Sequence, residues 1–286
     1  MKASLKEVLA WAEERNCAVG SFNTPTFENV TAVISAAEEL GVPVIIAHAE
    51  VHENEGARLD DIGPLMVWAA ERAKVPVCVH LDHGEHPEYI YRAIDLGFTS
   101  VMIDASTCSY EDNAKVTKEV VTRAHAANVD VEAEIGSLAS REGGGDTGGG
   151  AVYTDPDLAK RFVDDTNIDA LAASFGTAHG IYKAKPVLDF ERIAKIRELT
   201  GIPLVMHGGS GVSPEDYKKA ITCGVRKINY YSYMARAGRN AVEEKLKEDI
   251  TFFHLLAGAA TDAMKEDAIK AMKRSKSTRL NSSHAT

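Results

Sequence analysis

The segment LVMHGGSGVS, residues 204–213, decides the predicted fold. It opens with a short apolar run after Pro203, which is typical of a buried strand. The run ends in His207, and a turn of three glycines and one serine follows. Ser213 and Pro214 then have the pattern of a helix start, with proline at the first helical position. The segment therefore predicts a strand that ends in a candidate metal ligand, followed by backbone N–H groups that suit an anion.

The same strand–turn–helix unit recurs along the whole chain. Each apolar run of strand length is followed by an amphipathic helical pattern. Continuous apolar strands that alternate with helices indicate a parallel sheet buried on both faces. Eight such units in 286 residues predict an α/β fold of the TIM-barrel type, a (β/α)8 barrel. The predicted strands are residues 17–22, 43–48, 76–82, 100–104, 129–135, 168–174, 204–207 and 225–229.

Two helices lie outside this repeat. One begins after Ser4 and is predicted to cap the N-terminal side of the barrel. The other, residues 255–273, is amphipathic and is predicted either to close the barrel wall or to form a dimer contact. We expect a single domain over residues 1–274. Residues 275–286 are polar and aperiodic, and we interpret them as a disordered tail that is not native.

Composition and charge limit the possible partners. The net charge is −10 without any basic block, which argues against a nucleic acid or an anionic membrane as the main partner. The first residues lead straight into a helix without a signal peptide, and no apolar run reaches the length of a membrane span. The four cysteines show no CxxC spacing. They are therefore expected to be reduced core residues of a cytoplasmic protein.

Polar residues gather where the predicted strands end. In a barrel these ends meet at one rim, where function is found. Three histidines at this rim could converge, and three neutral imidazoles leave a divalent ion the open positions that catalytic zinc requires. Any one of these histidines alone would more often be structural. The rim residues are Asp82, His83, Asp104, Glu134, His179, His207 and Asn229.

Five motifs in order carry a family resemblance. They read HLDH at 80–83, VMIDAS at 101–106, VEAEIG at 131–136, GTAHG at 176–180 and HGGSG at 207–211. Together they resemble the class II, zinc-dependent ketose-bisphosphate aldolases, of the fructose- and tagatose-bisphosphate type. The resemblance covers about residues 1–273, and this family is built on the same barrel that the strand count predicts.

The resemblance implies a metal site. His83, His179 and His207 match the family's zinc ligands, and the zinc would bind oxygens of dihydroxyacetone phosphate. Asp104 and Glu134 match positions that hold zinc at a second, outer location; the alternative is that they orient the histidines. The resemblance also allows for a monovalent cation.

Two acidic residues match the family's proton-transfer groups. Asp82 matches the acid that exchanges a proton with the oxygen on C4, and beside His83 it is expected to point away from the metal. Glu142, eight residues after Glu134, matches the base that takes the C1 proton. The loop over residues 139–150 departs from the family pattern, so a solvated glycine-rich linker is the alternative interpretation.

The resemblance also implies substrate contacts in three loops. The glycine–serine turn after residue 207 matches the phosphate site, and a lysine would supply local positive charge to an acidic protein. Tyr230-Tyr231 stands where the family carries smaller residues, which leaves the exact sugar open. The matching residues are Gly180 and Lys183, Gly208, Gly209 and Ser210, and Asn229 and Ser232.

The sequence thus predicts reversible, zinc-dependent aldol cleavage of a ketose 1,6-bisphosphate to dihydroxyacetone phosphate and an aldehyde phosphate. A homodimer or homotetramer is expected. Three alternatives stay open. The enzyme could act on another dihydroxyacetone-phosphate adduct, such as a deoxy-keto-gluconate phosphate. A non-catalytic sugar-phosphate-binding paralogue is the second. A lysine Schiff base through Lys227 is the third, although that residue is interpreted more readily as an outer barrel residue.

Overall fold

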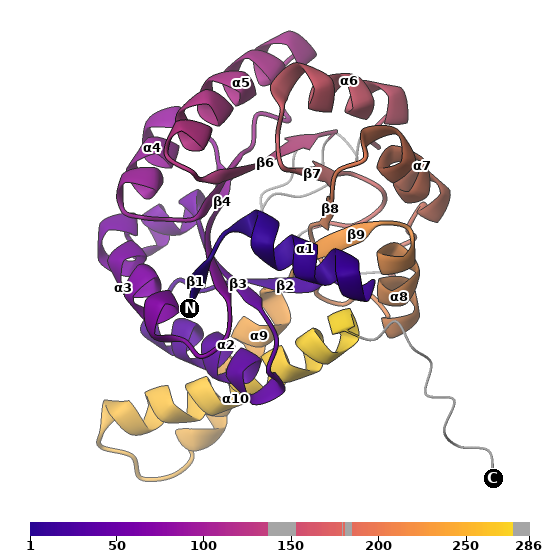
Figure 1. Ribbon diagram of the computed structural model, residues 1–286. Coiled ribbons are helices and arrows are strands. Elements are labelled where there is room, and N and C mark those ends of the chain that lie inside the picture. Colours follow the sequence, from indigo (N-terminus) through magenta and orange to yellow (C-terminus); the bar gives the residue numbers. More distant parts are fainter. Residues whose placement is uncertain (137–152, 179, 181–184, 277–286) are drawn as a thin grey trace, which may run out of the picture.

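The computed structural model describes residues 1–136, 153–178, 180 and 185–276. Eight parallel strands, β2 to β9, form a closed barrel (Figure 1). β2 pairs with β3 and β9, and β4 pairs with β5 to complete the ring. The predicted (β/α)8 barrel is confirmed. The strands are β2 Val19–Asn23, β3 Val44–Ala49, β4 Val77–Gly84, β5 Ser100–Ile103, β6 Asp130–Ile135, β7 Ala170–Ala173, β8 Leu204–Met206 and β9 Val225–Asn229.

Helices surround the barrel, and their starts follow the capping residues in the sequence. Ser109 and Ser213 each accept a hydrogen bond from the backbone N–H three residues later, which satisfies a free donor of the helix. Proline occupies the first turn of α6 and α8, where it costs no hydrogen bond. The surrounding helices are α2 Phe27–Leu40, α3 Leu59–Arg72, α4 Pro87–Asp95, α5 Tyr110–Ala126, α6 Pro156–Thr166, α7 Phe190–Thr200, α8 Pro214–Thr222 and α9 Ser232–Lys245.

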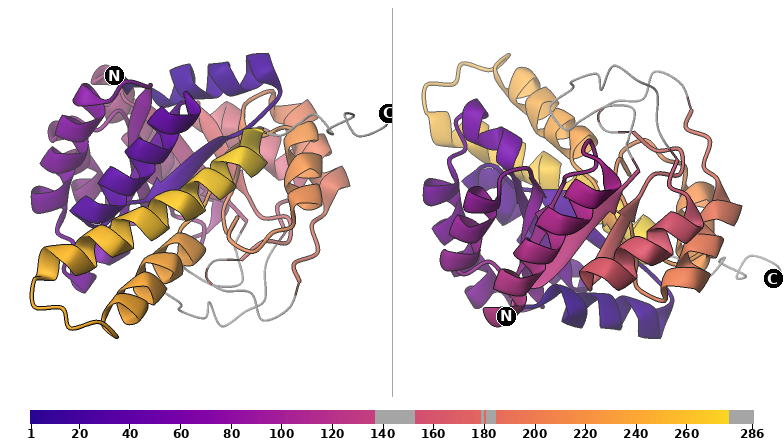
Figure 2. Two further views of the ribbon diagram at one scale, coloured as in Figure 1. Left: turned by 90° about the horizontal axis from the view of Figure 1, so that it is seen from below. Right: turned by 90° about the horizontal axis from the view of Figure 1, so that it is seen from above.

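Helix α1, Leu5–Arg15, crosses one end of the barrel (Figures 1 and 2). Its buried face packs against inward-facing apolar residues of the strands, among them Ile45, Cys78 and Val205. The predicted N-terminal capping helix is confirmed. Because this end is filled by apolar side chains, polar chemistry in the barrel must lie toward the other end, where the strands finish.

Two short elements are not predicted by the sequence patterns. β1, Lys2–Ala3, pairs with β4, and the 3-10 helix η1, Glu50–Glu55, follows β3. Both are too short to show a periodicity. Cys108 also departs from expectation: it is exposed, whereas Cys17 and Cys78 are buried core residues. Among the described residues, no helix is long and apolar enough to cross a membrane.

The last helix, α10, Phe253–Lys276, lies along α9 and α2 (Figure 2). It buries Met264, Ala268, Ala271 and Met272 against them, as the barrel-wall alternative requires. The helix extends past the predicted domain end at residue 274, and the Ala18 N–H donates to the carbonyl oxygen of Ser275 at 3.0 Å. Residues 277–286 of the predicted tail lie outside the described part of the chain.

Tyr230 connects α10 to the barrel. Its hydroxyl donates to Asp267 of α10 at 2.7 Å, and its ring meets Phe22 edge to face at 5.9 Å. Only 3% of Tyr230 is exposed. Its side chain therefore faces α10 and not the phosphate turn, so of the two tyrosines only Tyr231 remains a candidate neighbour of the substrate.

We predict that Tyr230→Phe lowers the free energy of unfolding by about 1–2 kcal/mol, because the Asp267 carboxylate loses a buried donor. Urea unfolding would measure the loss. Tyr110→Phe is a matched control, since its hydroxyl donates to Asp165 at the same 2.7 Å but at an exposed site, and its loss should be smaller. Equal losses in the two variants would contradict the role of Tyr230 as an anchor.

Candidate active site

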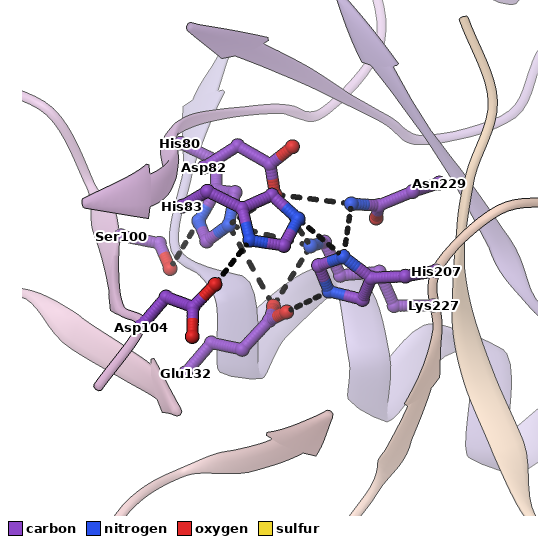
Figure 3. Close-up of polar contacts among 9 residues, drawn as sticks. All are labelled: His80, Asp82, His83, Ser100, Asp104, Glu132, His207, Lys227 and Asn229. Atoms are coloured by element: carbon purple, nitrogen blue, oxygen red, sulfur yellow. Dashed lines mark hydrogen bonds and ion pairs between the residues drawn. The ribbon is translucent and has the colours of Figure 1, made fainter. Parts of the chain in front are cut away.

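The barrel interior is arranged in layers. Alternate residues of a strand point to opposite faces, so every second residue faces inward. Along β4, Cys78 belongs to the apolar layer against α1, His80 lies above it, and Asp82 lies at the rim. On β9, Lys227 and Asn229 face inward in the same way (Figure 3). The interpretation of Lys227 as an outer residue is therefore wrong.

A charged network fills the layer below the rim. The Lys227 ammonium lies 2.8 Å from Glu132 Oε2, 3.3 Å from His80 Nε2 and 3.9 Å from Asp82 Oδ1. All four side chains are fully buried. The contact with Glu132 is an ion pair without the alignment of a hydrogen bond, whereas Lys227 does donate to His80.

The obligate donor Lys227 fixes the proton on His80. An ammonium has no acceptor, so His80 Nε2 accepts and the ring proton lies on Nδ1, facing Ser100 Oγ at 2.9 Å. Burial and the nearby Lys227 charge lower the pKa of His80 to about 3. The ring is therefore neutral at physiological pH.

Glu132 links this network to His207. Its Oε1 lies 2.9 Å from His207 Nε2. Burial alone would raise the pKa of Glu132, but the Lys227 charge and the His207 hydrogen bond outweigh it and lower the pKa to about 2. Because an ionised carboxylate only accepts, Nε2 of His207 is the donor and its Nδ1 is left as an acceptor.

His83 is oriented by the same kind of contact. Its Nδ1 lies 2.8 Å from Asp104 Oδ2, and Asp104 Oδ1 accepts from the Ser106 hydroxyl at 2.7 Å. Burial opposes the charge of Asp104, but the His83 and Ser106 contacts outweigh it and lower the pKa of the carboxyl far below its usual value. His83 therefore donates from Nδ1, and its Nε2 faces His207.

The two histidines meet through the nitrogens that a metal would need. His83 Nε2 and His207 Nδ1 are 2.8 Å apart, and the opposite nitrogen of each ring is held by a carboxylate (Figure 3). Two ligands of a tetrahedral zinc lie about 3.3 Å apart, so a small opening would admit the ion. Carboxylates behind metal-bound histidines are the usual supporting arrangement. The donor set therefore fits a divalent metal.

Asp82 lies beside this pair, contrary to the expected orientation away from it. His83 has a left-handed backbone, with φ of 44°, and the register of β4 against β5 shifts between Leu81 and Gly84. This irregularity breaks the strand alternation, so neighbouring side chains face the same side. One oxygen of Asp82 lies within 4.8 Å of a ring nitrogen of both His83 and His207.

Asn229 holds one oxygen of Asp82 and leaves the other available. Its Nδ2 lies 3.0 Å from Asp82 Oδ1 and 3.4 Å from His207 Nδ1. Among the described residues, Asp82 Oδ2 has no hydrogen-bond partner. Burial would raise the pKa of Asp82, but electrostatic interactions, first with His83 and then with Lys227, outweigh it, so the pKa lies well below its usual value.

Glu134 is the remaining acid of the rim. It is 3% exposed, and its Oε2 has no partner in the described part of the chain. Burial and the charge of Asp104 raise its pKa well above the usual value. His83, Asp104 and Glu134 offer ligand atoms within 4.8 Å of one another. Asp104 already makes the contact of an orienting residue, while the outer metal position stays a prediction for both acids.

The glycine–serine turn is fixed between two strand ends. A Cβ on Gly208 would lie 2.1 Å from the Ala178 carbonyl oxygen, and Gly208 has a φ of 67°. The Gly209 N–H donates to the Asn229 carbonyl at 2.9 Å, so this donor is already used. Ser210 Oγ accepts from the Tyr231 N–H at 3.3 Å. These contacts fix the turn beside His207, while its role as a phosphate site stays a prediction.

Comparison with known proteins agrees with this geometry. The family model "Fructose-bisphosphate aldolase class-II" matches residues 3–279. This chain belongs to that family. It is therefore an aldolase on a TIM barrel, as the motifs predicted.

Several relatives show how far the likeness extends. Fructose-bisphosphate aldolase of Geobacillus stearothermophilus is 40% identical over 94% of this chain and 95% of its own. The 6-phospho-5-dehydro-2-deoxy-D-gluconate aldolase of Halalkalibacterium halodurans is also 40% identical, over 92% of each chain. The crystal structure of the YdjI aldolase from Escherichia coli K12 superimposes with a TM-score of 0.86 at 36% identity, covering 96% of this chain and 97% of that one.

Some predicted site residues lie outside the described part of the aldolase: His179, Lys183 and Glu142. Gly180 has a φ of 88°, and Ser232 is the first residue of α9. Sequence reasoning assigned no role to Glu132 or His80. The alternation within VEAEIG and HLDH could have found both, since each lies two residues before an assigned inward-facing acid.

A second group of buried histidines borders the site of the aldolase. His48 Nε2 lies 2.9 Å from the Tyr89 hydroxyl, which donates to Glu53 of η1 at 2.8 Å. His52 of η1 packs against Tyr231, with ring centroids 5.6 Å apart. These contacts tie η1 to α4 and bring it toward the end of β9.

His48 makes the stability of the aldolase depend on pH. Burial and the nearby His52 lower its pKa to about 4, whereas an unfolded histidine titrates near 6.5. Between these values the unfolded chain binds more protons, so stability falls as the pH falls. From pH 7 to pH 5, His48 should account for a loss of roughly 2 kcal/mol.

Urea unfolding at pH 7 and at pH 5 would measure the drop in the free energy of unfolding. In His48→Gln this drop should be smaller than in the unmodified protein by the roughly 2 kcal/mol assigned to His48. His86→Gln is the control. His86 is exposed, and its hydrogen bond to Glu50 raises its pKa, so its removal should not flatten the profile. A His48→Gln profile as steep as that of the unmodified protein would refute the assignment.

Proposed function

We propose that this protein catalyses zinc-dependent, reversible aldol cleavage of a ketose 1,6-bisphosphate, of the fructose or tagatose type. The products are dihydroxyacetone phosphate and an aldehyde phosphate. One observation carries the proposal: His83 Nε2 and His207 Nδ1 face each other at 2.8 Å, each ring backed by a carboxylate, with Asp82 beside them. A non-catalytic binding protein would not need an ionised acid at this point.

His83 and His207 would hold the zinc together with His179. When bound, such an ion supplies Lewis-acid polarisation of a substrate carbonyl. Asp104 and Glu132 each hold one ring nitrogen, so that the other nitrogen of each ring faces the proposed ion. We keep the outer zinc position at Asp104 and Glu134 as a proposal, and Lys227 as a Schiff-base residue is disfavoured because its ammonium is buried among three partners.

The acids would divide the proton transfers. In the cleavage direction the hydroxyl on C4 must lose its proton, and Asp82 is held ionised with Oδ2 available to accept it. Asn229 keeps the carboxylate in this orientation through Oδ1. Glu142 is proposed to take the C1 proton of dihydroxyacetone phosphate in the condensation direction and to return it to that carbon in cleavage.

The phosphate is proposed to bind at the turn of Gly208, Gly209 and Ser210, with contacts from Gly180, Lys183 and Ser232. The turn is rigid and lies next to Asn229, the proposed triose contact. For the aldehyde half, a second candidate exists because two relatives of equal identity have names with different substrates. Cleavage of a 6-phospho-5-dehydro-2-deoxy-gluconate is therefore the alternative.

We further propose a cytoplasmic enzyme that forms a homodimer or homotetramer. Phe253, the first residue of α10, and Phe252 before it are 76% and 63% exposed, as a contact between copies would allow. Sedimentation of the purified protein would give the oligomeric state.

A substrate panel with metal removal tests the reaction. Fructose 1,6-bisphosphate, tagatose 1,6-bisphosphate and the deoxy-gluconate phosphate would be assayed before and after chelation. We expect cleavage of a bisphosphate to vanish with the chelator and to return with zinc. Chelator-resistant cleavage with an intermediate trapped by borohydride would overturn the zinc mechanism, and cleavage of the deoxy-gluconate phosphate alone would select the second candidate.

Two variants separate the proton transfers. Asp82→Ala should lower turnover about 10²- to 10⁴-fold while zinc stays bound and C1 proton exchange of dihydroxyacetone phosphate continues. Glu142→Gln should instead slow that exchange. NMR in deuterated water measures it without any aldehyde. If exchange is unchanged in Glu142→Gln, that residue is not the base.

A further inference from the structure

Lys227 has no role in the chemistry proposed above, yet it occupies the centre of the barrel. Its ammonium lies among His80, Asp82 and Glu132, a group whose ligand atoms are close enough to hold a metal ion. The side chain is fully buried (Figure 3). A fixed cation therefore already occupies the space where a second ion could bind.

The contacts of Lys227 lead to one metal-binding residue. Lys227 pairs with Glu132 Oε2 at 2.8 Å, and the other oxygen, Oε1, receives His207 Nε2 at 2.9 Å. On its far side Lys227 is held by His80, which Ser100 fixes in turn. Because an ammonium can only donate, Lys227 donates to His80 and the His80 Nδ1 proton faces Ser100, while the Glu132 carboxylate accepts from His207.

We propose that Lys227 is a positioning residue for metal binding. It holds Glu132 so that Glu132 orients His207, with Nδ1 turned toward His83. The proposal rests on the proposed metal site but not on any substrate. Partners behind metal-bound histidines change metal affinity about 10- to 100-fold when removed, and Lys227 would act one step behind such a partner.

Without Lys227, Glu132 Oε2 would still lie 3.6 Å from His80 Nε2. That nitrogen is an acceptor in the intact network and offers no proton to the carboxylate. Glu132 would then lose its attachment to β9 while staying buried. The geometry of Oε1 toward His207 would no longer be fixed.

Zinc affinity of the metal-free protein tests the proposal, by competition with a chromophoric chelator and without substrate. We expect Lys227→Met to bind zinc about 10- to 100-fold more weakly, and Glu132→Gln to do the same. Because Lys227 acts through Glu132, adding Lys227→Met to Glu132→Gln should cause no further loss. The spectrum of bound cobalt should shift alike in both single variants.

Arg226→Met is the matched control. Arg226 precedes Lys227 on β9 but points outward, where it pairs with Glu13 of α1 at 2.8 Å. This variant also removes a mostly buried cation from the same strand, and only 7% of Arg226 is exposed. Its zinc affinity should equal that of the unmodified protein.

The outcomes are separable. Unchanged zinc affinity in folded Lys227→Met overturns the proposal, and so does a further loss when it is added to Glu132→Gln. If Lys227→Met does not fold, Glu132→Gln still tests the step through Glu132, since zinc affinity equal to that of the unmodified protein would overturn the proposal. If the unmodified protein binds no zinc, the proposed function and this inference both fail. If zinc binding behaves as expected but no bisphosphate is cleaved, only the proposed function fails.

Discussion

The ion pair between Lys227 and Glu132 is the interaction on which the site depends. A buried carboxylate without a partner is costly, because its charge is taken out of water. Lys227 is the charged partner of the buried Glu132 carboxylate, and it also lies near the buried carboxylate of Asp82. Lys227 thus offsets part of the negative charge in the interior before any metal or substrate arrives, and through Glu132 it helps to set the orientation of His207.

The layering of the barrel follows from the same constraint. Apolar residues beside α1 close one end, so the charged network is excluded from water on that side. The rim above it is where polar atoms become available, as Asp82 Oδ2 shows. The apolar layer beside α1 lowers the local dielectric constant. This strengthens the contacts that orient the histidines, because charges interact more strongly away from water.

The barrel could be predicted from the sequence because eight apolar runs alternate with helical patterns over the whole chain. The residues of the rim could be predicted because each apolar run ends at an identifiable position in the sequence. The side that each residue faces could not always be predicted. The bulge at His83 defeats simple alternation, and Tyr230 faces α10 through a contact with Asp267 that lies far along the chain. Lys227 was placed outside because a lysine within a buried layer needs partners that no local pattern reveals.

The turn at Gly208 has a consequence for altering specificity. Its close approach to Ala178 leaves no room for a side chain, so the ends of β7 and β8 form one interlocked unit. The loop after β8 cannot be exchanged for that of another aldolase without also exchanging the segment after β7. In evolution or in the laboratory, these two loops would have to change together.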